Sequence, residues 1–261
     1  MIGMDNASPT ILLIAGTAEA RALAAAIAQD FPAARLIVSL LGATSEPAPY
    51  AGALRIGGFG GAEGLAAFLR AEGITHLIDA AHPFAAGIHR NAAAAATSAG
   101  VPYLAVIRRE WPSRLGWQHF ACLGAASAAL PFGSRPFLAL GQRHLAPFRH
   151  RSDIAPVLRM AEPPQARLPF VADVIVGPPS RDVEQEARLF REHAVTHLVC
   201  RNSGGDAGLA KLDAAECLGI PVFMIRRPGI CRNVEATTLN AAVIWLHGKL
   251  NGRIGSYLDT T

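Results

Sequence analysis

The sequence of 261 residues is poor in cysteine, and its four cysteines are scattered without the C-x-x-C or Cys/His spacing of a metal site. They are expected to be reduced thiols, and no metal cofactor is expected. No apolar run approaches the roughly 18 residues that span a bilayer. The first ten residues also lack the basic region of a secretory signal peptide. These absences lead us to expect a cytoplasmic protein with no membrane contact.

Lysine is scarcer still, because Lys211 and Lys249 are the only two although the formal net charge is +4. Arginine therefore carries almost all of the positive charge, and its guanidinium binds carboxylates and phosphates with two parallel hydrogen bonds. The codon bias of a GC-rich genome would produce the same composition. The arginines are dispersed, without an aromatic–basic strip or a helix-turn-helix pattern, so no nucleic-acid partner is expected. An anionic small molecule is the ligand class that this composition favours.

Short apolar runs alternate with alanine-rich helical patterns along the whole chain. In the first half, the runs at 11–15, 34–42 and 75–80 are each followed by a turn or a helical segment. This alternation predicts an α/β protein with two Rossmann-like domains, in which mainly parallel sheets are flanked by helices.

Two phrases of the first half return in the second half. "GITHLIDAAHP" (73–83) resembles "AVTHLVCRNSGG" (194–205), and "SAGVPYLAVIRRE" (98–110) resembles "CLGIPVFMIRRPG" (217–229). We interpret them as two related halves, although short apolar strands can look alike by chance. The prediction is a cofactor-binding domain at 1–133 and a substrate domain at 134–261, and an exchange of strands between them is left open.

The stretch "LLIAGTAEAR" (12–21) is typical of a strand, a turn and a helix that bind a dinucleotide, but only Gly16 of the usual three glycines is present. Gly16 allows close approach to the backbone, and Thr17 offers a hydroxyl where the helix begins. Unpaired N–H groups and the helix dipole suit a phosphate at that point. A tight turn without a ligand explains the pattern about as well. The candidate cofactor residues here are Gly16, Thr17, Ala18, Glu19 and Arg21.

The ends of the next strands complete the expected cofactor site. The strand at 34–42 ends with Ser39 where an enzyme that binds NAD would have an acidic residue, which favours NADPH over NADH. Gly58 belongs to a glycine-rich turn that can cover a cofactor or simply reverse the chain. Asp79 ends another apolar strand and is added to the candidate cofactor residues.

Two polar turns supply the candidate catalytic and substrate residues. In "DAAHPFA" (79–85), His82 and Pro83 are expected to begin a helix, and His82 could donate a proton, bind an anion or only cap that helix. "RNSGGDAG" (201–208) could form an anion-binding nest, with Lys211 one turn into the next helix, or be a solvated loop.

These motifs in this order, with "RREW" and "LALG", resemble the precorrin-6A reductases of cobalamin biosynthesis over about residues 11–228. Ala15 and Ala81 stand where glycine and threonine are expected, which puts one hydroxyl contact in doubt. The resemblance implies two Rossmann-like domains and NADPH-dependent reduction of one double bond, which converts precorrin-6A to precorrin-6B. It also implies an anionic tetrapyrrole as substrate and transient contact with neighbouring enzymes of the pathway.

The resulting hypothesis assigns a role to each candidate. His82 and Lys211 are the candidate catalytic residues, although water or the substrate itself could also supply the proton. The expected substrate-binding residues are Pro83, Arg143, Asn202, Ser203, Gly204 and Gly205. Two other functions stay open: a regulatory module that binds a dinucleotide without turnover, and a tetrapyrrole transferase that uses S-adenosylmethionine.

Overall fold

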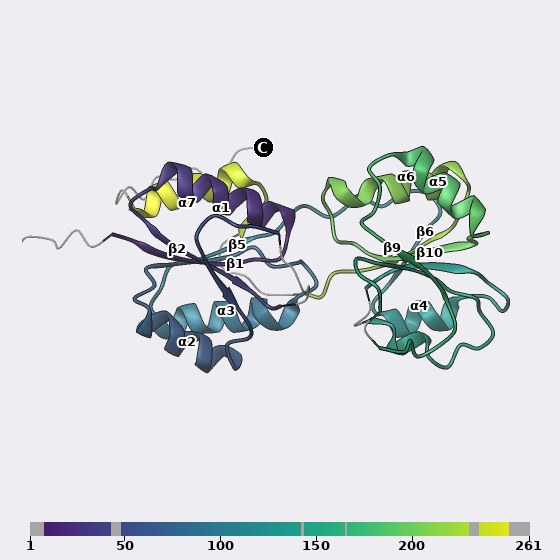
Figure 1. Cartoon of the computed structure of the whole chain (residues 1–261), viewed down its shortest axis with the longest axis horizontal. Helices are drawn as coiled ribbons and strands as arrows, with labels where there is room; N and C mark the ends of the chain where they lie inside the picture. The colour runs from purple at the N-terminus through teal and green to yellow at the C-terminus, as the bar shows by residue number, and fades with distance from the viewer. Residues whose placement is uncertain (1–7, 43–47, 142–143, 165, 230–234, 251–261) are drawn as a thin grey trace, which may run out of the picture. The chain divides into compact units, whose positions relative to one another are not determined.

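The computed structural model describes residues 8–42, 48–141, 144–164, 166–229 and 235–250 (Figure 1). The chain forms two compact units, residues 1–108 together with 229–261, and residues 109–228. Each unit is built on one parallel sheet of six strands. Within the described ranges, no helix has the length and apolar character needed to traverse a bilayer.

The first unit has the strand order β12-β5-β4-β1-β2-β3. Its strands are β1 (Thr10–Ile14), β2 (Arg35–Leu40), β3 (Ala53–Ile56), β4 (His76–Asp79), β5 (Tyr103–Val106) and β12 (Glu235–Ala236). Helices α1 (Ala18–Asp30) and α7 (Leu239–Leu250) cover one face, and α2 (Gly61–Ala71) and α3 (Ala86–Ala99) cover the other (Figure 1).

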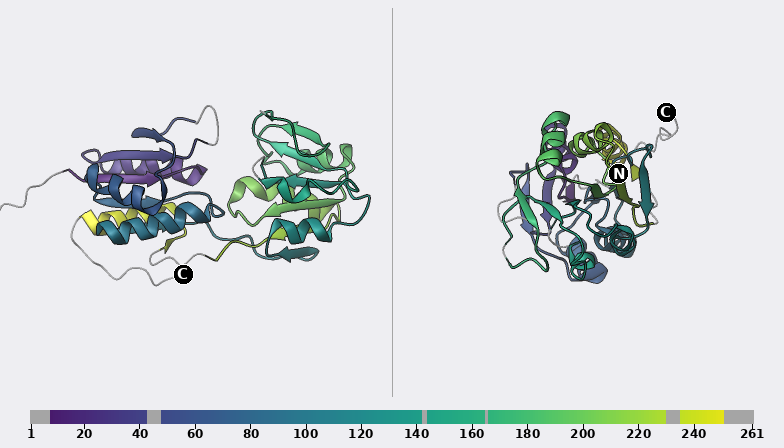
Figure 2. Two further views of the ribbon diagram at one scale, coloured as in Figure 1. Left: turned by 90° about the horizontal axis from the view of Figure 1, so that it is seen from below. Right: turned by 90° about the vertical axis from the view of Figure 1, so that its right-hand side faces the viewer.

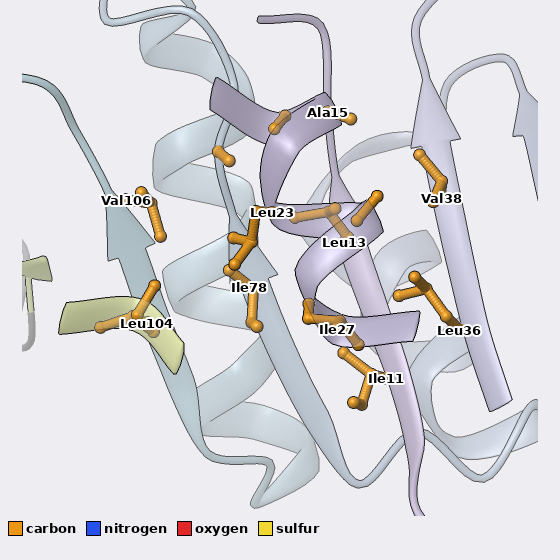
Figure 3. Packing of buried hydrophobic residues seen from close by; sticks show 14 of the residues in the cluster. Ile11, Leu13, Ala15, Leu23, Ile27, Leu36, Val38, Ile78, Leu104 and Val106 are labelled. Atoms are coloured by element: carbon orange, nitrogen blue, oxygen red, sulfur yellow. The ribbon is translucent and has the colours of Figure 1, made fainter. Parts of the chain in front are cut away.

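Strand β1 shows why its sequence is almost continuously apolar. Ile11 and Leu13 pack against Leu23 and Ile27 of α1 (Figure 3), whereas Leu12 contributes to the core on the opposite face of the sheet. A central parallel strand is buried on both faces, so every position favours an apolar side chain. The prediction of parallel sheets flanked by helices is confirmed.

The second unit has the strand order β6-β11-β10-β7-β8-β9, and further views are given in Figure 2. Its strands are β6 (Trp117–Phe120), β7 (Pro136–Ala139), β8 (Val157–Met160), β9 (Asp173–Val176), β10 (His197–Arg201) and β11 (Val222–Ile225). Its helical segments are α4 (Leu123–Ala129), η2 (Ala146–Phe148), α5 (Val183–Glu192), η3 (Asp206–Gly208) and α6 (Leu209–Cys217).

The two sheets have the same topology, but each takes its sixth strand from the other half of the sequence. Strand β6 follows β5 in the chain and yet pairs with β11, with Trp117 opposite Val222. Strand β12 follows β11 and pairs with β5, with Ala236 opposite Val106. The exchange left open above therefore occurs.

This exchange corrects the expected single boundary between residues 133 and 134. The chain leaves the first unit at 108/109 and returns to it at 228/229. The physical reason is the pairing of β6 within the second sheet and the packing of α7 on the first, where Ala242 and Leu246 are fully buried.

The repeated Thr-His-Leu phrases make the same contacts in both units. The Thr75 hydroxyl accepts the N–H of Thr10, and the Thr196 hydroxyl accepts the N–H of Arg135. Each hydroxyl also lies 2.9 Å from Nδ1 of the histidine that follows it. The halves thus share local contacts as well as topology, in agreement with the interpretation of the repeated phrases.

Candidate functional site

A pocket of about 280 Å³ lies in the first unit, at the edge where the parallel strands end. The turns that follow β1, β2, β3 and β4 line it, so residues far apart in the sequence meet there. The chain order reverses at β1, between β2 and β4, which is where open α/β sheets bind their ligands. Of the predicted residues, this pocket is lined by Gly16, Ser39, Gly58 and His82.

Thr17 caps helix α1 and ties it to β4. Its Oγ1 accepts the N–H of Ala20 at 3.0 Å and donates to the carbonyl of Ala80, also at 3.0 Å. The hydroxyl hydrogen of Thr17 is therefore donated to the backbone of the protein. Thr17 positions the turn instead of donating to a ligand. The N–H groups of Ala18 and Glu19 belong to the first turn, where no helical carbonyl can accept them. Those N–H groups are the ones that suit an anion.

Gly16 adopts a conformation that requires glycine. Its φ of +137° lies in a region that residues with a side chain rarely adopt. The sequence therefore places glycine at the point where the chain turns from β1 towards α1.

Glu19 and Arg21 lie beside the pocket and do not line it. Arg108 donates to both carboxylate oxygens of Glu19 at 3.1 Å, which joins α1 to the end of β5. Arg21 lies over the ring of Tyr50, with its Cζ 5.4 Å from the ring centroid. Glu19 lines a smaller hollow of about 30 Å³ together with Thr17, Pro83 and Arg108.

Arg55 is a residue of the site that the sequence analysis missed. It stands near the end of β3 and donates to Ser39 Oγ at 3.4 Å and to the carbonyls of Gly57 and Gly58 at 2.6 and 2.8 Å. The guanidinium thus supports the glycine-rich turn and places positive charge next to Ser39. In the sequence, the signal that could have identified Arg55 is its position immediately before that glycine-rich turn.

His82 reaches the pocket from a turn that precedes helix α3. The helix begins at Ala86, so His82 and Pro83 do not begin it as expected. The reason is a tight turn, in which the N–H of Ala85 donates to the His82 carbonyl at 2.7 Å. The N–H of Phe84 donates to Nδ1 of His82 at 3.2 Å, so the proton of the neutral ring is on Nε2.

Asp79 is fully buried and is not among the residues that line the pocket. Its Oδ1 accepts the N–H of Ala81 at 3.1 Å, and its Oδ2 lies 2.6 Å from Nδ1 of His89, whose side chain is also fully buried. The structure therefore gives Asp79 a place behind the His82 turn, in contrast to the direct cofactor contact expected. His89 was also missed, because nothing in its helical segment distinguishes it.

In the second unit, the side-chain amide of Asn202 forms its hydrogen bonds within the protein. Its side chain accepts the N–H of Trp111 at 2.9 Å and donates to the Trp111 carbonyl at 3.1 Å. Asn202 is 3% exposed, so both bonds are shielded from water. The side chain holds the segment that enters this unit, which differs from the substrate contact expected of it.

Of the remaining predicted residues of this turn, two glycines pack against the same segment and Ser203 contacts Arg227. Gly204 has a φ of +68°, and a Cβ there would collide with the carbonyl of Arg109. The indole N–H of Trp111 donates to the Gly205 carbonyl at 2.9 Å. The Ser203 carbonyl accepts a hydrogen bond from Arg227 at 3.1 Å.

Lys211 is a buried cation in the second unit. Its Nζ donates to the Gly208 carbonyl at 3.1 Å and lies 5.1 Å from the centroid of the Trp111 ring. Arg143 lies outside the described residues. Nearby Cys200 is no candidate nucleophile, because burial raises its thiol pKa to about 11. The described residues of the chain include no group of three side chains able to hold a metal ion.

Comparison with known proteins covers almost the whole chain. The profile of a family described as "Precorrin-6x reductase CbiJ/CobK" matches residues 10–247. A precorrin-6A reductase from Rhodococcus erythropolis is 42% identical over 240 residues, which are 90% of this chain and 96% of that protein. One from Rhodobacter capsulatus is 40% identical over 245 residues, 91% of this chain and 96% of that protein.

A solved structure agrees with this match. It is described as "CobK precorrin-6A reductase", is 37% identical and superposes with a TM-score of 0.85 over 92% of this chain and 97% of its own.

Proposed function

The chain belongs to the precorrin-6x reductase family CbiJ/CobK, and from this membership we propose that it reduces precorrin-6A to precorrin-6B in cobalamin biosynthesis with NADPH. It is then an oxidoreductase that acts on a CH–CH group. The observation that carries the proposal is the match over nearly the full length of relatives named for this reaction, together with a pocket at the switch point of the first sheet.

The residues of the first unit fit a dinucleotide. The pyrophosphate would face the N–H groups of Ala18 and Glu19, where the dipole of α1 favours an anion and Gly16 leaves room for close approach. One half of the cofactor would occupy the 280 Å³ pocket beside Ser39 and Gly58. When bound, the nicotinamide supplies the hydride, and the protein contributes orientation and electrostatics.

Charge at the end of β2 favours NADPH over NADH. None of the described residues that line the pocket is acidic, and this described part of the lining therefore offers no carboxylate to an unphosphorylated ribose. Arg55 donates to Ser39 Oγ and brings a cation to this position. A 2′-phosphate would be attracted to that charge.

The tetrapyrrole substrate carries several carboxylates, and arginines of the second unit could bind them. Arg109 and Arg226 are exposed at the two segments that flank the turn after β10. Ser203, Gly204 and Gly205 form this turn, and they are proposed to contact the substrate. Asn202 and Lys211 would hold the turn and Trp111 in place.

His82 would serve the reaction as a hydrogen-bond donor. Its Nδ1 accepts the N–H of Phe84, and the proton on Nε2 is held in a ring that lines the pocket. As long as this bond is kept, the ring stays neutral and orients a bound group. The proton that completes the reduction then comes from water or the substrate, or from His82 after the Phe84 contact has broken.

The test is anaerobic incubation of the purified protein with precorrin-6A and NADPH, followed at the nicotinamide absorbance. We expect oxidation of NADPH in proportion to precorrin-6B formed. Binding of NADPH without oxidation would favour the regulatory module instead. Thermal stabilisation by S-adenosylmethionine, and not by NADPH, would favour the transferase.

A further inference from the structure

Behind the His82 turn lies a fully buried pair of side chains for which the proposed reaction has no direct use. His89 and Asp79 have no exposed side-chain surface, and Nδ1 of His89 lies 2.6 Å from Oδ2 of Asp79. The other ring nitrogen, Nε2, lies 3.0 Å from the backbone carbonyl of His82. We propose that His89 is a positioning residue, a buried imidazolium that fixes the His82 turn against Asp79. The kinetic part of this inference rests on the proposed function.

The partners of His89 determine where its hydrogens are. A carbonyl oxygen can only accept, so Nε2 carries a hydrogen and donates it to His82. The hydroxyl of Tyr103 donates to Oδ2 of Asp79 at 3.2 Å, and the N–H of Ala81 donates to Oδ1. Donors thus converge on both oxygens of the Asp79 carboxylate, which favours its charged form. Nδ1 of His89 then carries the second hydrogen, and the ring is positively charged.

This arrangement controls the backbone from which the His82 ring extends. The His82 carbonyl accepts from Nε2 of His89 and from the N–H of Ala85. The ring itself is held by the N–H of Phe84. Without the His89 bond, the His82 carbonyl loses its contact with the His89 ring of α3 and keeps the N–H of Ala85. A shift of about 1 Å at a residue that orients a bound group costs roughly 100-fold in rate.

The second unit offers an internal comparison. Cys200 of β10 is the counterpart of Asp79 of β4. Asp79 is opposite the last residue of β1, and Cys200 is opposite the last residue of β7, the corresponding strand of the second sheet. The described residues of the second unit include no fully buried histidine. The shared fold therefore forms without such a pair. Among the described residues, a buried Asp–His pair at this strand position occurs only in the first unit, directly behind the pocket residue His82, which indicates a role in that site.

The first test examines the ring of His89 without any substrate. We expect ¹⁵N–¹H spectra of the uniformly labelled protein near neutral pH to show hydrogens on both nitrogens of one buried histidine ring. Assignment would come from the spectrum of His89→Gln, in which these signals must disappear. A His89 ring in which one nitrogen carries no hydrogen would overturn the assignment of a positive charge to that ring.

The second test separates positioning from folding by comparing three variants. His89→Leu removes both N–H groups, and His89→Gln keeps an amide nitrogen near the place of Nε2. The control, Thr75→Val, removes the hydrogen bond between the Thr75 hydroxyl and Thr10, before β4 begins, and touches neither Asp79 nor His82. We expect kcat to fall about 100-fold in His89→Leu. KM for NADPH should stay within about threefold. His89→Gln should recover part of the loss, and Thr75→Val should retain the kcat of the unaltered protein.

Several outcomes would overturn the positioning role. One is an unchanged kcat in His89→Leu, and another is an equal loss in Thr75→Val, which would indicate general destabilisation. If His89→Leu does not fold, the comparison of the kcat of His89→Gln with that of Thr75→Val at matched Tm decides. If the unaltered protein binds NADPH but does not oxidise it, the proposed function fails. The spectra of His89 and the shift of the His82 ring signals in His89→Gln still test the inference.

Discussion

The guanidinium of Arg55 lies over the ring of Phe59, with its Cζ 3.8 Å from the ring centroid. Both residues flank the glycines whose carbonyls Arg55 holds. The contact combines cation–π attraction with hydrogen bonds to the backbone, so it fixes the turn and leaves a positive charge beside the pocket.

This relationship predicts how Arg55 affects the choice of cofactor. In Arg55→Met, we expect the Kd of NADPH to rise about 10-fold to 100-fold, which corresponds to the loss of one charge-assisted hydrogen bond. The Kd of NADH should change much less, because NADH has no 2′-phosphate. Fluorescence titration with both cofactors measures this. Arg70→Met, which removes an exposed arginine of α2, is the control, and equal losses for NADPH and NADH would argue against recognition of the phosphate.

The cap formed by Thr17 predicts a loss of stability when its hydroxyl is removed. Thr17→Val keeps the shape of the side chain but leaves the N–H of Ala20 and the carbonyl of Ala80 without their partner. We expect the free energy of unfolding to fall by about 1 kcal/mol. Thr17→Ser should retain most of it. Chemical denaturation measures the difference, with Thr97→Val on α3 as a matched exposed control.

Asn202 is predicted to stabilise the second unit more than it affects substrate binding. Asn202→Ala would leave the buried N–H and carbonyl of Trp111 unsatisfied, at a cost of about 2 kcal/mol. Urea unfolding followed by tryptophan fluorescence reports on this directly. A variant with undiminished stability but a raised KM for the tetrapyrrole would restore the substrate contact that the sequence suggested.

His76 and His197, the histidines of the two repeated Thr-His-Leu phrases, predict a loss of stability in acid. Burial lowers the pKa of His76 below the ordinary 6.5, with a further contribution from Lys249, and burial lowers that of His197. As the pH falls, these two histidines are therefore protonated in the unfolded chain at a higher pH than in the folded protein. Stability is complete above about pH 6.5 and is lost as the pH falls below it. Asp153, whose pKa is lowered by the hydrogen bond from Arg151, contributes only at lower pH.

Thermal unfolding between about pH 7.5 and pH 5.5 measures this effect. In His76→Gln we expect the fall in Tm over that interval to be smaller than in the unaltered protein, while His150→Gln, at an exposed position, should follow the unaltered protein. An identical slope in all three proteins would exclude His76 as a source of the acid sensitivity.

Much of the site could be predicted because its signals are local. A parallel strand ends where its apolar run ends, so Gly16, Ser39, Gly58 and His82 could each be placed at the same sheet edge from a few neighbouring residues. Their convergence in one pocket also depends on the strand order β4-β1-β2-β3, which the structure shows and the alternation of strands and helices does not specify.

The partners of these residues could not be predicted in the same way. Asn202 and Trp111 are 91 positions apart and meet only because the chain enters the second unit at residue 109. His89 lies on an alanine-rich helix, where a histidine has no distinguishing pattern. Strand β12 has two residues, too few for any periodic signal, so the boundary between the units was equally hidden.

The exchanged edge strands constrain how this protein can be made and inherited. As the chain emerges from the ribosome, the first sheet has to wait for residues 235–236, which are synthesised only after the entire second unit. The second unit has all six strands of its sheet within residues 109–228, whereas the first unit is completed by β12 and cannot be moved to another gene as one uninterrupted segment.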